Sequence, residues 1–267
     1  FANTANDNFA FTRIQSKAVK CGVVGTGCET EMEGIFYVMG GGREESVSIH
    51  YISAGTYQSI APRSVDQIIA SYSEDELQDA VLETRVTERD KFIIVRLPNH
   101  TLLYNKSVAD IYGNAQAWTT VKSEITNDGP WRGVNGVSVP NVGWVYGDLN
   151  TTKIGVLDSS VATQYGEQVE TIMYTPLVDM DDASINELEI DILPGHQVSS
   201  EDTISFISLT YDGLTFGKEW SLSYGVKGNY INRFIANRLG YIRDFVGYKV
   251  RTVSSGRVAF SRCSLDY

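Results

Sequence analysis

The sequence predicts an all-β protein in which β-propeller-like blades with a short helical insert precede a C-terminal antiparallel β-sandwich. Apolar and polar residues alternate along most of the 267 residues, as they do in half-buried strands. Groups of three or four such segments recur at roughly forty to fifty residues, the spacing of propeller blades. A later series of strands with tight turns suits two packed sheets.

The predicted blades lie near residues 34–61, 91–122 and 131–158. In the first, Val47, Ile49 and Tyr51 alternate with polar residues after a Gly-rich turn, so a hairpin is expected with His50 on its polar face. This alternation places one side of each blade against a core.

The helical insert is expected over residues 64–86, where apolar residues follow a helical period. Ser64 with Gln67 and Ser73 with Glu76 both match the capping-box pattern at a helix start. Because the second pattern lies inside the segment, the sequence predicts two short helices with a break near 71–73.

The sandwich is expected from about Tyr165 onward, so we place the domains at 1–162 and 163–267. Asp212-Gly213 predicts a hairpin turn between 207–211 and 214–217. Glu187 and Glu189 alternate with apolar neighbours on another strand, which predicts an acidic outer face that could meet a basic surface of a neighbouring subunit.

The last fifty residues reverse the charge of the chain. They hold nine Lys and Arg against three Asp and Glu, whereas the preceding 217 residues hold 13 against 30. Three interpretations are open: a solvated face with intrachain ion pairs, a contact with carboxylates of another protein, and contact with DNA phosphates. The candidate protein–protein contact residues are Arg233, Arg238, Arg243, Lys249 and Arg251.

No catalytic centre is expected. His50, His100 and His196 lie in different segments, and no nucleophile-elbow or zinc-protease motif occurs. The glycines of 22–27 are followed by glutamates instead of a helix, so a turn-rich loop is expected instead of a phosphate site. Asp179, Asp181 and Asp182 do not satisfy an EF-hand pattern. We therefore expect no enzyme, cofactor or metal, with a loose divalent-ion site at the aspartates as the alternative to a solvated turn.

The compartment is expected to be reducing, because three cysteines without a framework suit free thiols. No apolar run is long enough for a membrane span, and residues 1–15 lack the features of a leader. Because the sequence begins at Phe1 without Met, we expect an upstream part of the blades to be missing, or present as a separate chain.

Aromatic residues on short strands leave a second class of function open. Trp131, Trp144 and Tyr146 could stack on sugars in a carbohydrate- or receptor-binding module, although packing is the commoner use of such residues. A glycosidase built on a propeller would need two convergent carboxylates, which a sequence does not display.

Three passages resemble the packaged DNA stabilization proteins of short-tailed bacteriophages, also described as tail accessory factors or tail hub proteins. The resemblance extends from about Tyr57 to the C-terminus. Its passages are the helical segment 64–86 with 92–105, the segments 175–180 and 185–192, and the C-terminal 237–251 with 262–267.

The resemblance implies a structural virion protein of a phage tail, with propeller-like blades and an appended β-sandwich. It implies a homo-oligomeric ring that assembles with portal, adaptor, tail needle and tailspike proteins, closes the portal channel and retains packaged DNA. DNA would pass as cargo without direct contact, since a net charge of −11 repels phosphates. The chain would fold in the cytoplasm of the host bacterium and reside in the virion.

Overall fold

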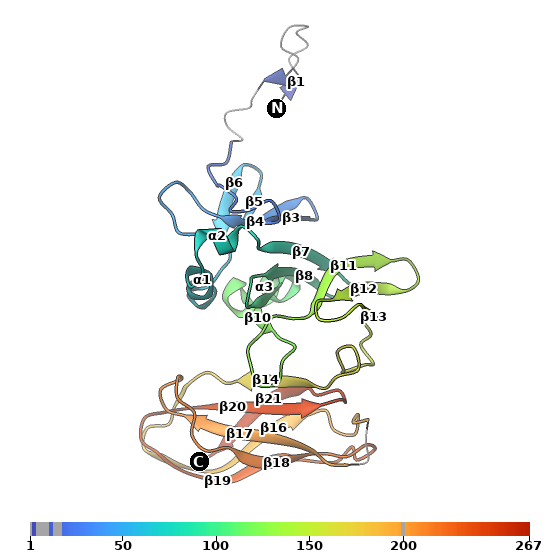
Figure 1. The fold of residues 1–267 in the computed structure, drawn as a ribbon. Coiled ribbons are helices and arrows are strands. Elements are labelled where there is room, and N and C mark those ends of the chain that lie inside the picture. Colours follow the sequence, from blue (N-terminus) through green and yellow to red (C-terminus); the bar gives the residue numbers. More distant parts are fainter. Residues whose placement is uncertain (1, 4–10, 13–17, 199–200) are drawn as a thin grey trace. The chain divides into compact units, whose positions relative to one another are not determined.

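The computed structural model describes residues 2–3, 11–12, 18–198 and 201–267 (Figure 1). The chain forms two compact units, one of residues 1–122 with 128–136 and the other of residues 123–127 with 137–267. Residues 1–15, where we expect no leader, lie mostly outside the described ranges. The domain boundary at 162/163 stays a prediction. In the part of the chain that is described, no helix has the length and apolarity to cross a membrane.

The first sheet of the N-terminal unit is a four-stranded antiparallel meander. Neighbours in the sequence are neighbours in the sheet, which is the arrangement of a propeller blade. Gly34 has a φ of 79° in the turn after the first strand, a conformation that favours glycine. The strands are β3 (Glu29–Met32), β4 (Ile35–Gly40), β5 (Ser48–Ser53) and β6 (Thr56–Ser59).

His50 corrects a prediction in this sheet. It lies between Ile49 and Tyr51, so the strand period places it on the other face, as expected. That face is not solvated at this point, however, because His50 is only 6% exposed. Segments outside the strand cover it, and a two-residue period carries no information about them.

The second sheet repeats the meander and lies against the first. The hydroxyls of Thr30 on β3 and Thr84 on β7 are 3.4 Å apart, and the Leu82 amide donates to Gly27 at 2.8 Å. A short β pair, β1 (Ala2–Asn3) with β2 (Phe11–Thr12), precedes both sheets in the chain. The strands of the second sheet are β7 (Val81–Val86), β8 (Lys91–Arg96), β9 (Thr101–Asn105) and β10 (Trp118–Val121).

Two short helices connect these sheets, with the predicted break between them. They are α1 (Arg63–Ala70) and α2 (Glu74–Leu77). Ser73 caps α2 with the reciprocal Glu76 contact that its pattern predicts. Pro62 takes the N-cap position of α1 without a side-chain bond, so the capping box predicted at Ser64 is wrong.

The helical prediction is also wrong after α2. Residues 81–86 form strand β7, because pairing with β8 outweighs the helical pattern of a short segment. A helix that we did not predict, α3 (Lys106–Tyr112), follows β9 and is capped by the Asn105 side chain, which accepts from Ser107 and Val108 amides. A 3₁₀ turn, η2 (Asn114–Gln116), leads into β10.

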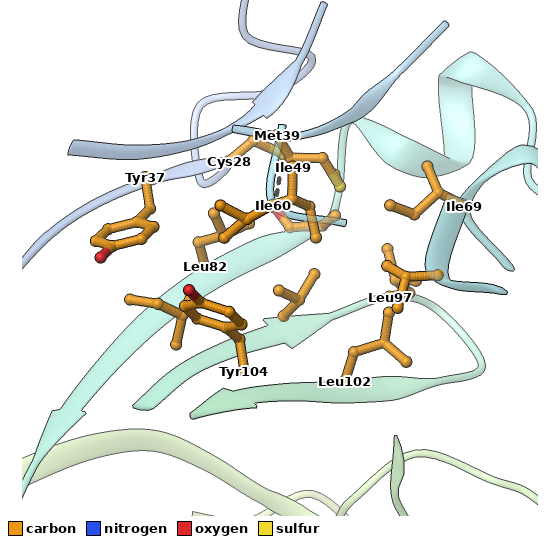
Figure 2. Close-up of a cluster of buried hydrophobic side chains, with 14 of the residues drawn as sticks. Cys28, Tyr37, Met39, Ile49, Ile60, Ile69, Leu82, Leu97, Leu102 and Tyr104 are labelled. Atoms are coloured by element: carbon orange, nitrogen blue, oxygen red, sulfur yellow. Dashed lines mark hydrogen bonds between the residues drawn. The ribbon is translucent and has the colours of Figure 1, made fainter. Parts of the chain in front are cut away.

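The core of the N-terminal unit lies between its two sheets and α1 (Figure 2). Ile49 of β5 and Ile93 of β8 are fully buried, and Ile69 of α1 is fully buried as well. The Ile60 amide donates to the Ile49 carbonyl at 2.9 Å and continues β5–β6 pairing toward the helix. Each such side chain contributes about 1.5–3 kcal/mol by leaving water.

A third, three-stranded sheet has the order β11-β12-β13. Its strands are β11 (Gly133–Val139), β12 (Gly143–Asp148) and β13 (Ile154–Val156).

Two further antiparallel sheets in the C-terminal unit pack face to face around a shared core. One has the order β14-β20-β17-β18, with β15 also paired to β20, and the other has the order β19-β16-β21. The strands are β14 (Val169–Tyr174), β15 (Val178–Asp179), β16 (Ala183–Ile192), β17 (Thr203–Thr210), β18 (Trp220–Gly225), β19 (Phe234–Ile242), β20 (Phe245–Ser254) and β21 (Phe260–Asp266).

The predicted hairpin after β17 exists, but its second strand is misplaced in our prediction. Residues 214–217 remain in the loop, and Trp220 pairs with Ile207 instead. The Asp212 carboxylate accepts from the amides of Leu214 and Thr215 at 2.8 Å. Together with the Thr215 hydroxyl, these bonds hold the pKa of Asp212 well below its usual range. Asp212 thus stabilises a wider loop than the two-residue turn.

Ser73→Ala should lower the free energy of unfolding by about 1 kcal/mol, because it removes an N-cap. Urea denaturation followed by circular dichroism measures the change. Ser64→Ala is the matched control, because the Ser64 side chain does not cap α1. This substitution should leave the midpoint of urea denaturation unchanged. Equal destabilisation by both substitutions would contradict this assignment of the caps.

Candidate functional site

The five basic residues that we predicted as a contact surface all lie on or beside strands β19 and β20. The structure divides them into two groups. Three have carboxylate partners within the chain: Arg233, Lys249 and Arg251. The other two, Arg238 and Arg243, are exposed, and among the described residues neither has an ion pair within 4 Å.

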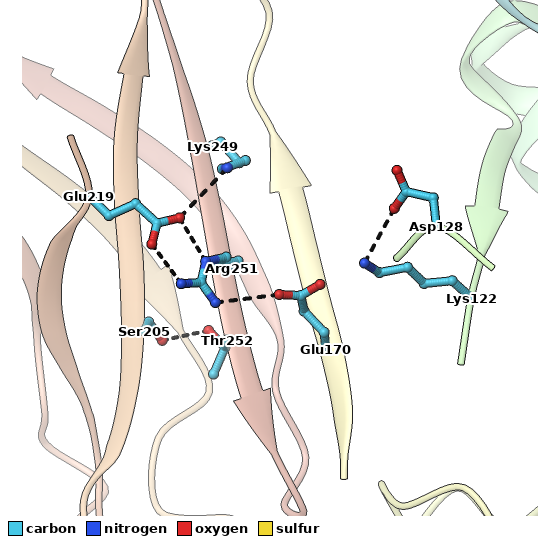
Figure 3. Close-up of polar contacts among 8 residues, drawn as sticks. All are labelled: Lys122, Asp128, Glu170, Ser205, Glu219, Lys249, Arg251 and Thr252. Atoms are coloured by element: carbon cyan, nitrogen blue, oxygen red, sulfur yellow. Dashed lines mark hydrogen bonds and ion pairs between the residues drawn. The ribbon is translucent and has the colours of Figure 1, made fainter. Parts of the chain in front are cut away.

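Arg251 is the centre of an ion-pair network on the outer face of the larger sandwich sheet (Figure 3). Its guanidinium donates through Nε and Nη2 to the two carboxylate oxygens of Glu219, at 2.7 and 2.6 Å. Glu170 on β14 lies 3.5 Å from Nη1. The hydrogen bonds from Arg251 lower the pKa of Glu219 and raise that of Arg251 itself. The network therefore connects β14, β20 and the loop before β18.

Lys249 extends this network along the same strand face. Its Nζ lies 3.7 Å from Glu219 and 5.0 Å from the centre of the Phe216 ring, while Arg251 stacks 4.3 Å from the ring centre of Phe206. The buried residues Val250 and Thr252 alternate with these cations and face inward. The two basic side chains thus stabilise the sheet that carries them.

Arg233 forms a two-pronged ion pair across the smaller sheet. Its Nε and Nη2 donate to Glu189 at 2.8 Å each, and Glu187 lies 3.8 Å away. The Arg233 hydrogen bonds lower the pKa of Glu189. The acidic face predicted on β16 exists, and the chain itself supplies a basic partner for it.

Arg238 occupies a β-bulge on the edge strand β19. Pairing passes from Asn237 opposite Glu187 to Gly240 opposite Ile185, so two residues of β19 oppose one residue of β16. Arg238 has a φ of 59°, a left-handed conformation that costs a non-glycine residue about 1–2 kcal/mol. Bulges of this kind redirect a side chain away from the sheet.

Arg243 lies at the corner where the chain passes from β19 in one sheet to β20 in the other. Its carbonyl accepts from the Asp182 amide at 2.9 Å, and the neighbouring Asp244 carbonyl accepts from Met180 at 2.8 Å. These backbone bonds fix the corner while the Arg243 side chain stays exposed.

The acidic turn at 179–182 packs against that corner. Asp181 and Asp182 have positive φ values of 44° and 62°, and Asp182 accepts from the Tyr241 hydroxyl at 2.5 Å. This bond raises the pKa of Tyr241. Within the ranges that are described, no group of three or more potential ligands is arranged for a metal ion.

The other residues that we considered for chemistry have packing contacts. Each histidine ring contacts a tyrosine: His50 with Tyr57, His100 with Tyr72, and His196 with Tyr230. A Cβ on Gly25 would come within 2.1 Å of the Gln78 carbonyl oxygen, so this loop glycine permits close backbone packing.

The aromatic residues considered for sugar stacking also contact their own chain. The Arg96 guanidinium lies 5.1 Å from the centre of the Trp131 ring, and Trp144 stacks on Tyr146 with ring centres 6.3 Å apart. Tyr146 itself is only 3% exposed. The free thiols of Cys21, Cys28 and Cys263 are spread over both units.

Comparisons with known proteins match most of the chain. The family model described as "Bacteriophage P22 Gp10, beta-propeller" matches residues 1–162, and the model described as "Bacteriophage P22 Gp10, beta-sandwich" matches residues 170–267. A curated relative, the tail hub protein gp10 of Salmonella phage P22, is 29% identical over 250 residues. The match covers 94% of this chain and 52% of that protein, so the chain spans about half of its relative's length.

One solved structure, a glycoside hydrolase family 43 arabinoxylan arabinofuranohydrolase from Bacillus subtilis in complex with cellotetraose, aligns over 89% of this chain and 53% of its own. Its identity is 9% and its TM-score is 0.26, so the likeness carries no argument.

Arg251→Met should lower the free energy of unfolding at neutral pH by about 2 kcal/mol, because it removes the two charge-assisted hydrogen bonds from Arg251 to Glu219. Since the pKa of Glu219 is lower in the folded state, this stabilisation is complete above the ordinary Glu pKa and is lost as the pH falls below about 4. Denaturation of both proteins from pH 7 to pH 3 measures it.

Arg243→Met is the matched control for that experiment and should change stability by less than about 0.5 kcal/mol. A difference between wild type and Arg251→Met that is constant over the pH range would contradict the ion-pair account.

Proposed function

The chain belongs to the Bacteriophage P22 Gp10 family, with its β-propeller followed by its β-sandwich, and we propose that it is a structural protein of a bacteriophage tail. The match of family models to both parts of the chain is the observation that carries this proposal. The name of the curated relative, a tail hub protein, supports it and favours a role without catalysis.

In this proposal the protein extends and closes the portal channel and retains packaged DNA. It does so as a homo-oligomeric ring in the virion, bound to portal, adaptor, tail needle and tailspike proteins. The blades occupy 1–162 and the sandwich 163–267. DNA passes as cargo, because the net charge of −11 repels phosphates. The basic side chains of the sandwich either form ion pairs within the chain or, in this proposal, bind carboxylates of another protein.

The contact surface consists of Arg238 and Arg243 in this proposal. Both guanidinium groups are exposed and carry five donors suited to carboxylates of another protein. Arg233, Lys249 and Arg251 instead stabilise the sandwich internally. The left-handed backbone at Arg238 supports this division, since a strained residue is retained where its side chain has a use.

Charge reversal at both free positions, Arg238→Glu with Arg243→Glu, should weaken assembly onto a purified portal–adaptor complex by at least about tenfold, as loss of one charged pair predicts. The melting temperature of the isolated chain should stay the same, because neither side chain has a partner among its described residues. Binding is measured by sedimentation with the complex at two salt concentrations.

The double variant Arg257→Glu with Arg262→Glu is the control for this pair, because both arginines are exposed and the two reversals make the same change in net charge. If it weakens assembly equally, the effect is one of overall charge and the proposed surface is wrong. Loss of several kcal/mol of monomer stability in the reversed variant would point to an internal role.

Arg238→Gly separates the strain of the bulge from its use. Glycine adopts the left-handed conformation freely, so the free energy of unfolding of the variant should stay the same or rise by up to about 1 kcal/mol. Denaturant unfolding measures this change. Assembly onto the portal–adaptor complex should weaken nevertheless. A variant that assembles like wild type would show that Arg238 has no part in the contact.

A further inference from the structure

A polar groove lies between helix α1 and strands β5 and β6 of the N-terminal unit. Its volume is about 790 Å³, the size of small-molecule sites in proteins. It is separate from the arginines of the sandwich, so an inference about it stands apart from the proposed tail role.

One wall of the groove is a single face of α1. Arg63, Asp66 and Gln67 line it at spacings of three and four residues, which bring side chains to one side of a helix. Asp66 Oδ1 accepts from the Ser48 hydroxyl at 2.6 Å, which fixes this carboxylate against β5. Arg63 and Gln67 are exposed toward solvent.

The floor of the groove consists of hydroxyls and an imidazole. The Ser48 and Ser59 hydroxyls lie 3.2 Å apart on β5 and β6, and His50 is their neighbour. His50 is 6% exposed, and its Nδ1 is buried without a hydrogen-bond partner among the described residues. A buried polar atom without a partner is uncommon in a native structure and calls for an explanation.

The opposite wall joins a carboxylate to an aromatic ring. The Tyr57 hydroxyl donates to both carboxylate oxygens of Glu45 at 3.1 Å, and this bond raises the pKa of Tyr57. The Tyr57 and His50 ring centres are 5.3 Å apart with their planes inclined at 60°. The wall thus offers an apolar ring face beside polar groups.

These groups together define the chemistry of a ligand. The carboxylates of Glu45 and Asp66 accept hydrogen bonds, and the guanidinium of Arg63 only donates them. The Gln67 amide and the imidazole can each donate or accept. Two carboxylates against one guanidinium disfavour an anion, and the described residues hold no cluster of three metal ligands. A hydroxyl both donates and accepts without charge, and several hydroxyls around an apolar ring face are the features of a sugar.

We propose that the groove between α1 and β5–β6 binds a saccharide, with Arg63, Asp66 and Gln67 bonding its hydroxyls and Tyr57 contacting its ring face. This site does not include Trp131, Trp144 and Tyr146, the aromatic residues that the sequence suggested for sugar stacking. Those residues contact other side chains of this chain. His50 supports it from the floor and gains a partner when a ligand hydroxyl or its bound water enters.

Saturation-transfer NMR on the purified chain tests this proposal. The probes are methyl α-D-mannopyranoside, methyl α-L-rhamnopyranoside and N-acetyl-D-glucosamine at millimolar concentration, followed by an array of bacterial and plant oligosaccharides. At least one sugar should receive saturation, and Asp66→Asn or Gln67→Leu should weaken its binding by about tenfold, as loss of a ligand hydrogen bond predicts. Asp75→Asn, an exposed change on α2, is the matched control and should bind like wild type.

His50→Phe distinguishes a ligand site from a purely structural histidine. It removes the unpartnered nitrogen and keeps a ring, so the free energy of unfolding should stay equal or rise while sugar binding falls. Absence of binding by every probe and array sugar would overturn the proposal, as would binding that all three groove variants retain. Neither result bears on assembly through Arg238 and Arg243.

Discussion

Strand β20 is the element on which the C-terminal unit depends most. It is hydrogen-bonded to β14, β15 and β17, and it supplies Val246, Tyr248 and Val250 to the buried core. Because side chains alternate along a strand, every inward residue fixes the orientation of its neighbours. Lys249 and Arg251 must therefore lie on the outer face, beside the carboxylates that neighbouring segments bring there.

That constraint explains why, among the described residues, three of the five candidate contact residues have ion pairs and only Arg238 and Arg243 have none. On regular strands, Arg251 meets Glu219 and Glu170, and Arg233 meets Glu189, because paired strands place side chains opposite one another. Arg238 and Arg243 lie where the regular pattern is interrupted, at a bulge and at the corner between sheets. Irregular backbone at these points directs charge away from the internal pairs and toward solvent. The basic residues of this stretch that have ion pairs thus stabilise the sandwich, and under the proposed function the two without ion pairs serve assembly.

The sequence allowed much of the architecture to be predicted, since alternating apolar residues and the Ser73–Glu76 pattern report directly on local structure. It misled where pairing with a distant strand decides the outcome, as at β7, or where a loop widens beyond its turn signal, as after Asp212. The five candidate contact residues were identified from the excess of Lys and Arg in the last fifty residues. Their division was not predictable, because linear spacing reveals neither the bulge at Arg238 nor the segment that meets each strand face. The groove at α1 joins residues from three elements, and its only sequence signal, His50, was expected in solvent.

The central claim is that Arg238 and Arg243 contact another virion protein while the other three basic residues remain within the sandwich. Electron cryomicroscopy of the chain assembled on a portal–adaptor complex tests it most directly. The account predicts carboxylates of another chain within about 4 Å of both guanidinium groups, the distance of an ion pair, with Arg251 still bound to Glu219. Both arginines facing solvent in the assembled state, or Arg251 released from Glu219 to contact a partner, would contradict it.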